Sequence, residues 1–158
     1  MRILAKRRRQ ERKTSYLKRK RLLESGLPRI VVRKTNKYIV VQYVESKTSQ
    51  DKVKYSATSK ELLKNGWPKE KQGSLKNLAA SYLTGLLFSK KLGDEKNNEM
   101  ILDTGLERVT SGSRIYAVLS GIVAGGARIK HSEEVLIDED KAKEKSEDIF
   151  NKVKEAIK

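Results

Sequence analysis

The order of the apolar patterns along this chain is the feature that most limits its fold. Three runs rich in β-branched and aromatic residues come first, at residues 29–34, 38–44 and 52–58. The first two runs are separated by only three polar residues, which predicts an antiparallel hairpin. In the third run polar and apolar residues alternate strictly, so Val53 and the other apolar residues of this run should share a face that meets the core.

Helical patterns begin only after these strands. A short capped helix is expected over residues 59–63, and a longer one from Ser74, as its N-cap, to Gly93. A short apolar run at residues 100–102 then predicts a buried strand, and a second long helix should follow from residues 111–113. Small residues on the first long helix predict a close approach by a neighbouring element.

This order predicts an α/β fold in which helices cover an antiparallel-rich mixed sheet. At 158 residues the chain fits a single compact domain with a basic N-terminal arm and a charged C-terminal helix. We place the arm at residues 1–25, the α/β core at 26–137 and the charged amphipathic helix at 138–158.

The charge is distributed unevenly. The chain has 36 Lys and Arg residues against 20 Asp and Glu residues, a net charge of +16. Residues 1–23 alone contain 11 basic residues and one acidic residue, whereas residues 132–158 contain 6 basic and 9 acidic residues. A polyanionic partner is therefore expected, and the early part of the arm should be disordered until phosphates neutralise it.

Several classes of function are poorly supported by the residue types present. The chain has no cysteine and a single histidine, His131, which leaves neither a nucleophile–base pair nor a metal-ligand set that is credible. The glycine-containing stretch 121–126 lies at the end of a predicted helix, where it is a C-cap rather than a phosphate-binding loop. We therefore expect no enzyme activity, no catalytic residue, no cofactor and no metal, although an RNA-modifying enzyme that uses only carboxylates and lysines would escape this argument.

The location and the class of partner follow from the same features. No apolar run is long enough for a membrane span, and the basic start lacks the apolar segment of a signal peptide, so a cytoplasmic protein is expected. A mitochondrial transit peptide would also be rich in arginine, but this basic segment runs directly into residues with a structural pattern. On charge alone RNA or DNA is the favoured partner, and a polybasic membrane-surface or protein-interaction module is the alternative.

Two further segments combine charge with groups suited to irregular RNA. The turn of the predicted hairpin has cations beside Asn36, for hydrogen bonds to base edges, and Tyr38, for stacking. A second set lies around the start of the second long helix, where backbone amides favour phosphate. Together with the arm, these segments give the candidate RNA-binding residues Arg7, Arg8, Arg9, Arg12, Lys13, Tyr16, Lys18, Arg19, Lys20, Arg21, Arg33, Lys34, Thr35, Asn36, Lys37, Tyr38, Arg108, Thr110, Ser111 and Arg114.

Four separated stretches resemble one known family, the large-subunit ribosomal protein L-eighteen family, whose eukaryotic members are called L-five. The matching stretches are YLKRKRLL at 16–23, PRIVVRKTNKYI at 28–39, NLAASYLTGLL at 77–87, and LDTGL at 102–106 continuing through TSGSRIYAVL at 110–119. They occur in the family's order and cover about residues 16–132. The insert at residues 64–67 and the absence of a long C-terminal extension favour an archaeal-type member, and Lys130 stands where relatives usually have proline.

The resemblance implies a structural protein of the large ribosomal subunit in the cytoplasm. It implies binding to 5S rRNA and attachment of that RNA to the large-subunit rRNA in the central protuberance, beside other 5S-binding and central-protuberance ribosomal proteins. No catalysis, cofactor or membrane is implied. The arm, the hairpin turn and the loop at 103–114 are the contacts that it implies.

Overall fold

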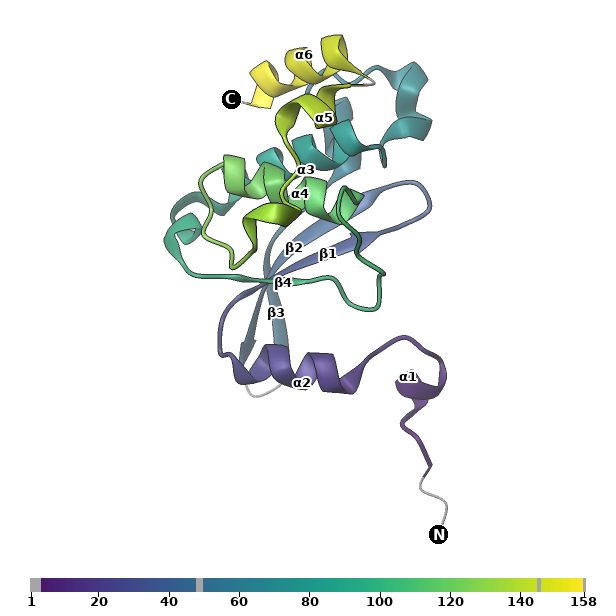
Figure 1. Cartoon of the computed structure of the whole chain (residues 1–158), viewed down its shortest axis with the longest axis vertical. Coiled ribbons are helices and arrows are strands. Elements are labelled where there is room, and N and C mark those ends of the chain that lie inside the picture. Colours follow the sequence, from purple (N-terminus) through teal and green to yellow (C-terminus); the bar gives the residue numbers. More distant parts are fainter. Residues whose placement is uncertain (1–3, 48–49, 145, 158) are drawn as a thin grey trace.

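The computed structural model describes residues 4–47, 50–144 and 146–157. Its centre is a four-stranded sheet with the strand order β3-β2-β1-β4 (Figure 1). The strands are β1 (Arg29–Lys34), β2 (Ile39–Lys47), β3 (Gln50–Thr58) and β4 (Ile101–Asp103). β1 and β3 pair antiparallel with β2, and β4 pairs parallel with β1, which confirms the predicted α/β fold with its antiparallel-rich mixed sheet.

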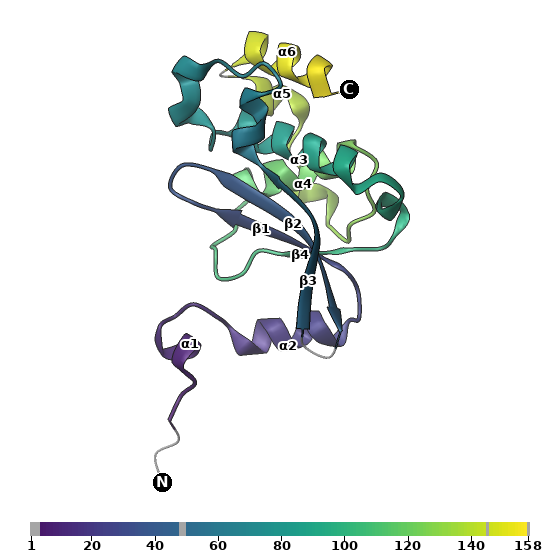
Figure 2. The same cartoon turned by 180° about the vertical axis from the view of Figure 1, so that it is seen from behind.

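Helices cover one face of this sheet and extend beyond it, as both views show (Figures 1 and 2). Two long helices, α3 and α4, lie on the sheet, and the N-terminal helices lie at its opposite end from α5 and α6. The helices are α1 (Arg7–Gln10), α2 (Tyr16–Glu24), α3 (Leu78–Leu92), α4 (Arg114–Ala124), α5 (Glu139–Lys143) and α6 (Glu147–Ile157). The 3-10 turns are η1 (Ser59–Leu63), η2 (Lys69–Ser74), η3 (Gly93–Asn97) and η4 (Glu133–Val135).

α3 begins later than the sequence predicted. Its N-cap is Asn77, whose side chain accepts a hydrogen bond from the Ala80 amide at 2.7 Å. The expected cap, Ser74, is wrong because its hydroxyl donates instead to the Lys71 carbonyl at 2.6 Å and closes the 3-10 turn η2. Asparagine is as good an N-cap as serine, so the local pattern alone did not distinguish the two positions.

The two long helices touch backbone to backbone. A Cβ atom on Gly85 would lie 2.3 Å from the Val118 carbonyl oxygen, and one on Gly121 would lie 2.1 Å from the Tyr82 carbonyl oxygen. Only glycine permits this approach. The close contact predicted from the small residues of α3 is therefore confirmed, and it fixes the position of α4 over the sheet.

The buried side chains form two clusters on either side of α3. The first lies between the sheet and the two long helices and includes Tyr43, Phe88 and Ile122. The second lies between α3 and the C-terminal helices and includes Trp67 and Phe150.

The C-terminal segment forms two helices, and the single helix predicted over 138–158 is wrong in this respect. Ala142 of α5 and Phe150, Val153 and Ile157 of α6 are buried in the second cluster, so the segment docks on α3 of the same chain. Both helices therefore place apolar side chains in the second cluster. Hydrogen bonds from Lys154 and Lys143 lower the pKa of Glu139. The bond from Lys154 of α6 joins the two helices, whereas Lys143 lies one turn away from Glu139 within α5.

Two residues, one in β3 and one after α4, depart from what the sequence led us to expect. Val53, expected in the core, is 48% exposed, because it lies past an irregularity between Tyr43 and Val44 at which the register of β2 and β3 shifts. Lys130 donates its backbone N–H to the Met100 carbonyl at 3.1 Å, a bond that proline could not make. Lysine at this position therefore adds a link between the segment after α4 and Met100, the residue before β4.

The glycines that end α4 act as predicted. Gly126 has φ +89° and donates its N–H to the Val123 carbonyl at 2.8 Å, as expected at a helix C-terminus. The His131 ring nitrogen Nδ1 lies 2.6 Å from the Ile129 carbonyl, a local hydrogen bond. Among the described residues, no three or more His, Cys, Asp and Glu side chains are grouped so that they could hold a metal ion.

Candidate nucleic-acid interface

The basic arm is attached to the body through helix α2. Ser15 caps this helix by accepting a hydrogen bond from the Lys18 amide. None of the nine α2 residues is buried, so packing contributes little to its placement. Instead, Arg19 Nη2 reaches Asp51 Oδ2 of β3 at 3.0 Å.

That ion pair belongs to an ionic network that crosses the sheet. Its centre is Arg29 of β1, whose side chain is only 3% exposed. The guanidinium of Arg29 donates to Asp51 Oδ1 at 2.6 Å, to Ser46 Oγ at 2.8 Å and to Asp103 Oδ2 at 3.1 Å. Although partial burial acts to raise the pKa of Asp51, hydrogen bonds from Ser46 and Arg29 lower it below its ordinary value, so Asp51 stays ionised.

Asp103 extends the network to the edge of the body. Its carboxylate binds Arg29 on one oxygen and Arg33 on the other, the latter at 3.1 Å. Arg33 also donates to the Asp103 carbonyl at 2.8 Å, and Asp103 Oδ1 accepts the Gly105 amide at 2.8 Å. Gly105 has φ +62°, and a Cβ there would meet the Arg33 guanidinium carbon at 3.0 Å. Asp103 thus holds both Arg33 and the loop after β4 in place.

We expect Asp103→Ala to lower the free energy of unfolding by about 3 kcal/mol or more. The substitution leaves the buried Arg29 short of one anionic partner, and uncompensated buried charge is costly. Chemical denaturation followed by circular dichroism measures the loss. Asp94→Ala, at an exposed position on η3, is the matched control, and equal stabilities for the two variants would contradict this role.

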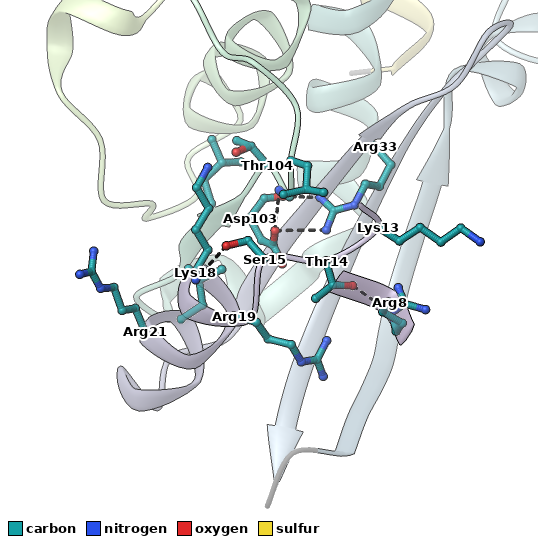
Figure 3. A pocket seen from close by; sticks show the side chains of 14 residues that line it. Arg8, Lys13, Thr14, Ser15, Lys18, Arg19, Arg21, Arg33, Asp103 and Thr104 are labelled. Atoms are coloured by element: carbon teal, nitrogen blue, oxygen red, sulfur yellow. Dashed lines mark hydrogen bonds and ion pairs between the residues drawn. The ribbon is translucent and has the colours of Figure 1, made fainter. Parts of the chain in front are cut away.

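Between the arm and the body lies a basic groove with a volume of about 410 Å³ (Figure 3). Six basic residues and one acidic residue line it. They are Arg8, Lys13, Lys18, Arg19 and Arg21 of the arm, Arg33 of β1, and Asp103. Since Asp103 already binds two arginines, the groove has an excess of positive charge that suits a polyanion.

The cations of the groove are held in place to different degrees. Arg8 donates to Thr14 Oγ1 at 2.9 Å, and Lys13 Nζ lies 2.9 Å from a Glu11 oxygen. Within the described part of the chain, Lys18 and Arg21 have no acidic partner. In Figure 3 Arg33 faces Asp103, while Lys18 extends from α2 on the other side of that carboxylate in this view.

The hairpin turn between β1 and β2 forms a second candidate contact. Thr35 closes the turn, because its amide and its hydroxyl both donate to the Tyr38 carbonyl at 2.8 Å. Asn36 and Lys37 are exposed at its tip. Tyr38 is half-buried against the second cluster, so its ring is partly engaged in packing.

The loop between β4 and α4 joins the groove to the turn. Gly105 and Leu106 line the groove, and Glu107 Oε2 binds Lys34 Nζ of the hairpin at 3.2 Å. The hairpin turn, this loop and α1 lie on the same side of the molecule in both views (Figures 1 and 2). These three segments therefore share one side of the molecule (Figures 1 and 2).

The remaining candidate residues lie outside the groove. Arg7, Arg9, Arg12 and Lys20 are exposed on the arm, and the Tyr16 ring lies under Lys6 Nζ at 4.7 Å. Arg108, Thr110 and Ser111 are exposed on the loop, and Arg114 lies at the start of α4, near the start of α3. No described helix is long and apolar enough to cross a membrane.

Sequence reasoning missed the residues that assemble this interface. Arg29 and Asp51 were not candidates, and Asp103 was included only as the first residue of the loop 103–114, without a role. One signal was present, because Arg29 and Arg33 are four residues apart and share a face of β1. Pairing them with particular acids needs the register of the sheet.

Most of the residues of this interface lie in a segment that matches a known protein family. Residues 3–99, more than half of the chain, match the family described as "Ribosomal large subunit proteins 60S L5, and 50S L18". The matched segment contains the arm from residue 3 onward, the hairpin and α3.

Curated relatives cover more of the chain. Large ribosomal subunit protein uL18 of Korarchaeum cryptofilum is 49% identical over 135 residues, which are 85% of this chain and 67% of that protein. The uL18 of Methanoregula boonei is 43% identical over 89% of this chain and 79% of its own length. The uL18 of Aeropyrum pernix is 43% identical over 82% of this chain, which spans only 59% of that protein. The chain belongs to the uL18 family of large-ribosomal-subunit proteins, in its archaeal branch, and the predicted location in the large subunit of the cytoplasmic ribosome follows from that membership.

Proposed function

We propose that this protein is a non-enzymatic structural component that binds 5S rRNA and attaches it to the large-subunit rRNA in the central protuberance. Its neighbours there are other 5S-binding and central-protuberance ribosomal proteins. The observation that carries the proposal is the basic groove, in which five cations of the arm and Arg33 of the body face one space. Membership of a ribosomal protein family agrees with this role.

The proposed division of labour follows from how each part is held. Residues 1–25 act as the basic arm and supply affinity, because counterion release depends on the number of neutralised phosphates. Residues 26–137 are the core, which supplies register through Arg33 and the hairpin turn. Residues 138–158 form the C-terminal unit that packs on α3. Residues 1–3, 48–49, 145 and 158 of these segments lie outside the described residues.

The contacts that we propose are the candidate residues of the arm, the hairpin turn and the β4–α4 loop. The arm contributes Arg7, Arg8, Arg9, Arg12, Lys13, Tyr16, Lys18, Arg19, Lys20 and Arg21, the turn contributes Arg33, Lys34, Thr35, Asn36, Lys37 and Tyr38, and the loop contributes Arg108, Thr110, Ser111 and Arg114.

The direct test is to purify the protein from its host and sequence the RNA that accompanies it. The proposal expects 5S rRNA to dominate after washing at moderate salt. Recovery of a mixture in proportion to cellular abundance would reject a 5S-specific role.

The hairpin turn offers a test of base recognition. Asn36→Ala should weaken binding to 5S rRNA about tenfold, because an exposed amide at the tip can hydrogen-bond to a base edge. Binding to a scrambled transcript of equal length should change less than twofold. Lys37→Gln is the matched control at the neighbouring exposed position, and it should weaken binding to both RNAs similarly. The same loss on both RNAs for Asn36→Ala would mean that the turn contacts only phosphates.

A further inference from the structure

The basic groove has an apolar side that phosphate binding does not require. Leu22 of α2, Leu102 of β4 and Leu106 of the loop line it together with the cations. Leu106 is 49% exposed, one of four large apolar side chains at this level of exposure among the described residues. A single exposed leucine is ordinary, but three leucines in one lining give an apolar surface on which an apolar part of a ligand can be buried.

The polar lining suits a nucleotide more than a bare phosphate. The hydroxyls of Thr14, Ser15 and Thr104 line the same space as the cations. Hydroxyls can donate to and accept from a ribose or a base edge. The lining therefore offers apolar contact, hydrogen bonds and positive charge together.

The size of the groove limits the kind of ligand that it can hold. Pockets for small ligands have volumes of about 300–1,000 Å³, and this groove has about 410 Å³. A base inside an A-form helix is stacked between its neighbours and presents only its edges, so it could not reach the leucines. An unpaired nucleotide can turn its base face outward.

We propose that the basic groove receives one unpaired nucleotide of the bound RNA, with its base against Leu22 and Leu106 and its flanking phosphates near Lys18 and Arg8. This inference rests on the proposed RNA binding but not on the identity of that RNA as 5S rRNA. It assigns the arm a second role beside charge. The arm closes one wall of a nucleotide-binding site, and the Arg19–Asp51 ion pair holds that wall against the sheet.

The test compares the binding of two probes to the full chain. They are a ten-nucleotide oligouridylate and an abasic ribose-phosphate strand with the same number of phosphates. We expect the protein to bind oligouridylate about fivefold tighter than the abasic strand, the factor expected if roughly 40 Å² of apolar surface leaves water. Equal binding of the two single strands would overturn the proposal, whereas the preference for 5S rRNA over a scrambled transcript is measured separately and could still hold.

Two variants locate the effect. Leu106→Asn removes the apolar surface at an exposed position without changing the charge, and it should reduce the ratio of oligouridylate to abasic affinity to near one. Lys18→Gln should weaken binding to both single strands by a similar factor and leave that ratio unchanged. A ratio that persists in Leu106→Asn would place the base elsewhere and overturn the proposal. Thermal unfolding of each variant checks that the fold is intact.

Discussion

Removal of residues 1–15 is expected to weaken binding to 5S rRNA by on the order of 100-fold at physiological salt. The deleted segment contains seven basic residues and one acidic residue. Each phosphate that it no longer neutralises lowers the number of released counterions, so the dependence of affinity on salt should become shallower as well. The folded body should persist, because none of the described residues of this segment belongs to the buried clusters. Filter binding across a series of salt concentrations measures both quantities.

Two controls separate charge from length. An arm of full length in which the seven basic residues are replaced by Gln should behave like the deletion. Lys152→Gln, on the exposed face of α6, should leave both affinity and salt dependence unchanged. If the deletion left the affinity and the salt dependence intact, the arm would have no part in RNA binding.

A large effect on stability is expected from Gly121→Ala. The added Cβ would lie 2.1 Å from the Tyr82 carbonyl oxygen and 3.1 Å from the Leu86 amide nitrogen. Both are backbone atoms inside α3, so relief requires the two long helices to separate, and the first cluster to loosen with them. We expect a loss of at least about 3 kcal/mol, a large part of the roughly 5–15 kcal/mol that stabilises a domain.

Gly73→Ala is the matched control, because nothing lies within 4 Å of the added Cβ. Its free energy of unfolding should stay within about 0.5 kcal/mol of the parent or rise slightly, since alanine restricts the unfolded chain. Urea denaturation of both variants measures the difference. Similar values would show that the helix contact tolerates a methyl group and that the close approach is not structurally important.

The strands and the two long helices could be predicted because their signals are local. The β-branched runs that became β1 and β2 are separated by a short polar turn, and the apolar residues of α3 and α4 recur at helical spacing. The small residues of α3 predicted a close approach by a neighbouring element, which the structure identifies as α4. Family resemblance and charge together indicated an RNA-binding protein of the large subunit.

The errors arose where tertiary contacts decided between similar local patterns. Ser74 and Asn77 are both good caps, and a hydrogen bond to Lys71 removes Ser74 from the choice. The amphipathic pattern after residue 138 looked continuous, but it is divided between α5 and α6, whose apolar residues share one cluster. Val53 follows the alternation of its strand and is nevertheless exposed, because the register shifts beside it.

The basic residues of the site could be predicted from the sequence, but the contacts that bring them together could not. The candidate list contained all six cations of the basic groove. It omitted Arg29, Asp51 and Asp103, whose importance depends on pairing between β1, β3 and β4. It also omitted Leu22 and Leu106, since a leucine among cations has no functional meaning until a shared cavity is visible.

The central claim is that one structured RNA, rather than polyanion in general, is the ligand. The most direct measurement is the ratio of the dissociation constants for a scrambled transcript and for 5S rRNA of equal length, at a fixed physiological salt concentration. The account predicts a ratio of about 1,000 or more, the lower end of specificity for dedicated nucleic-acid-binding proteins. A ratio near one would contradict it and leave only nonspecific charge attraction.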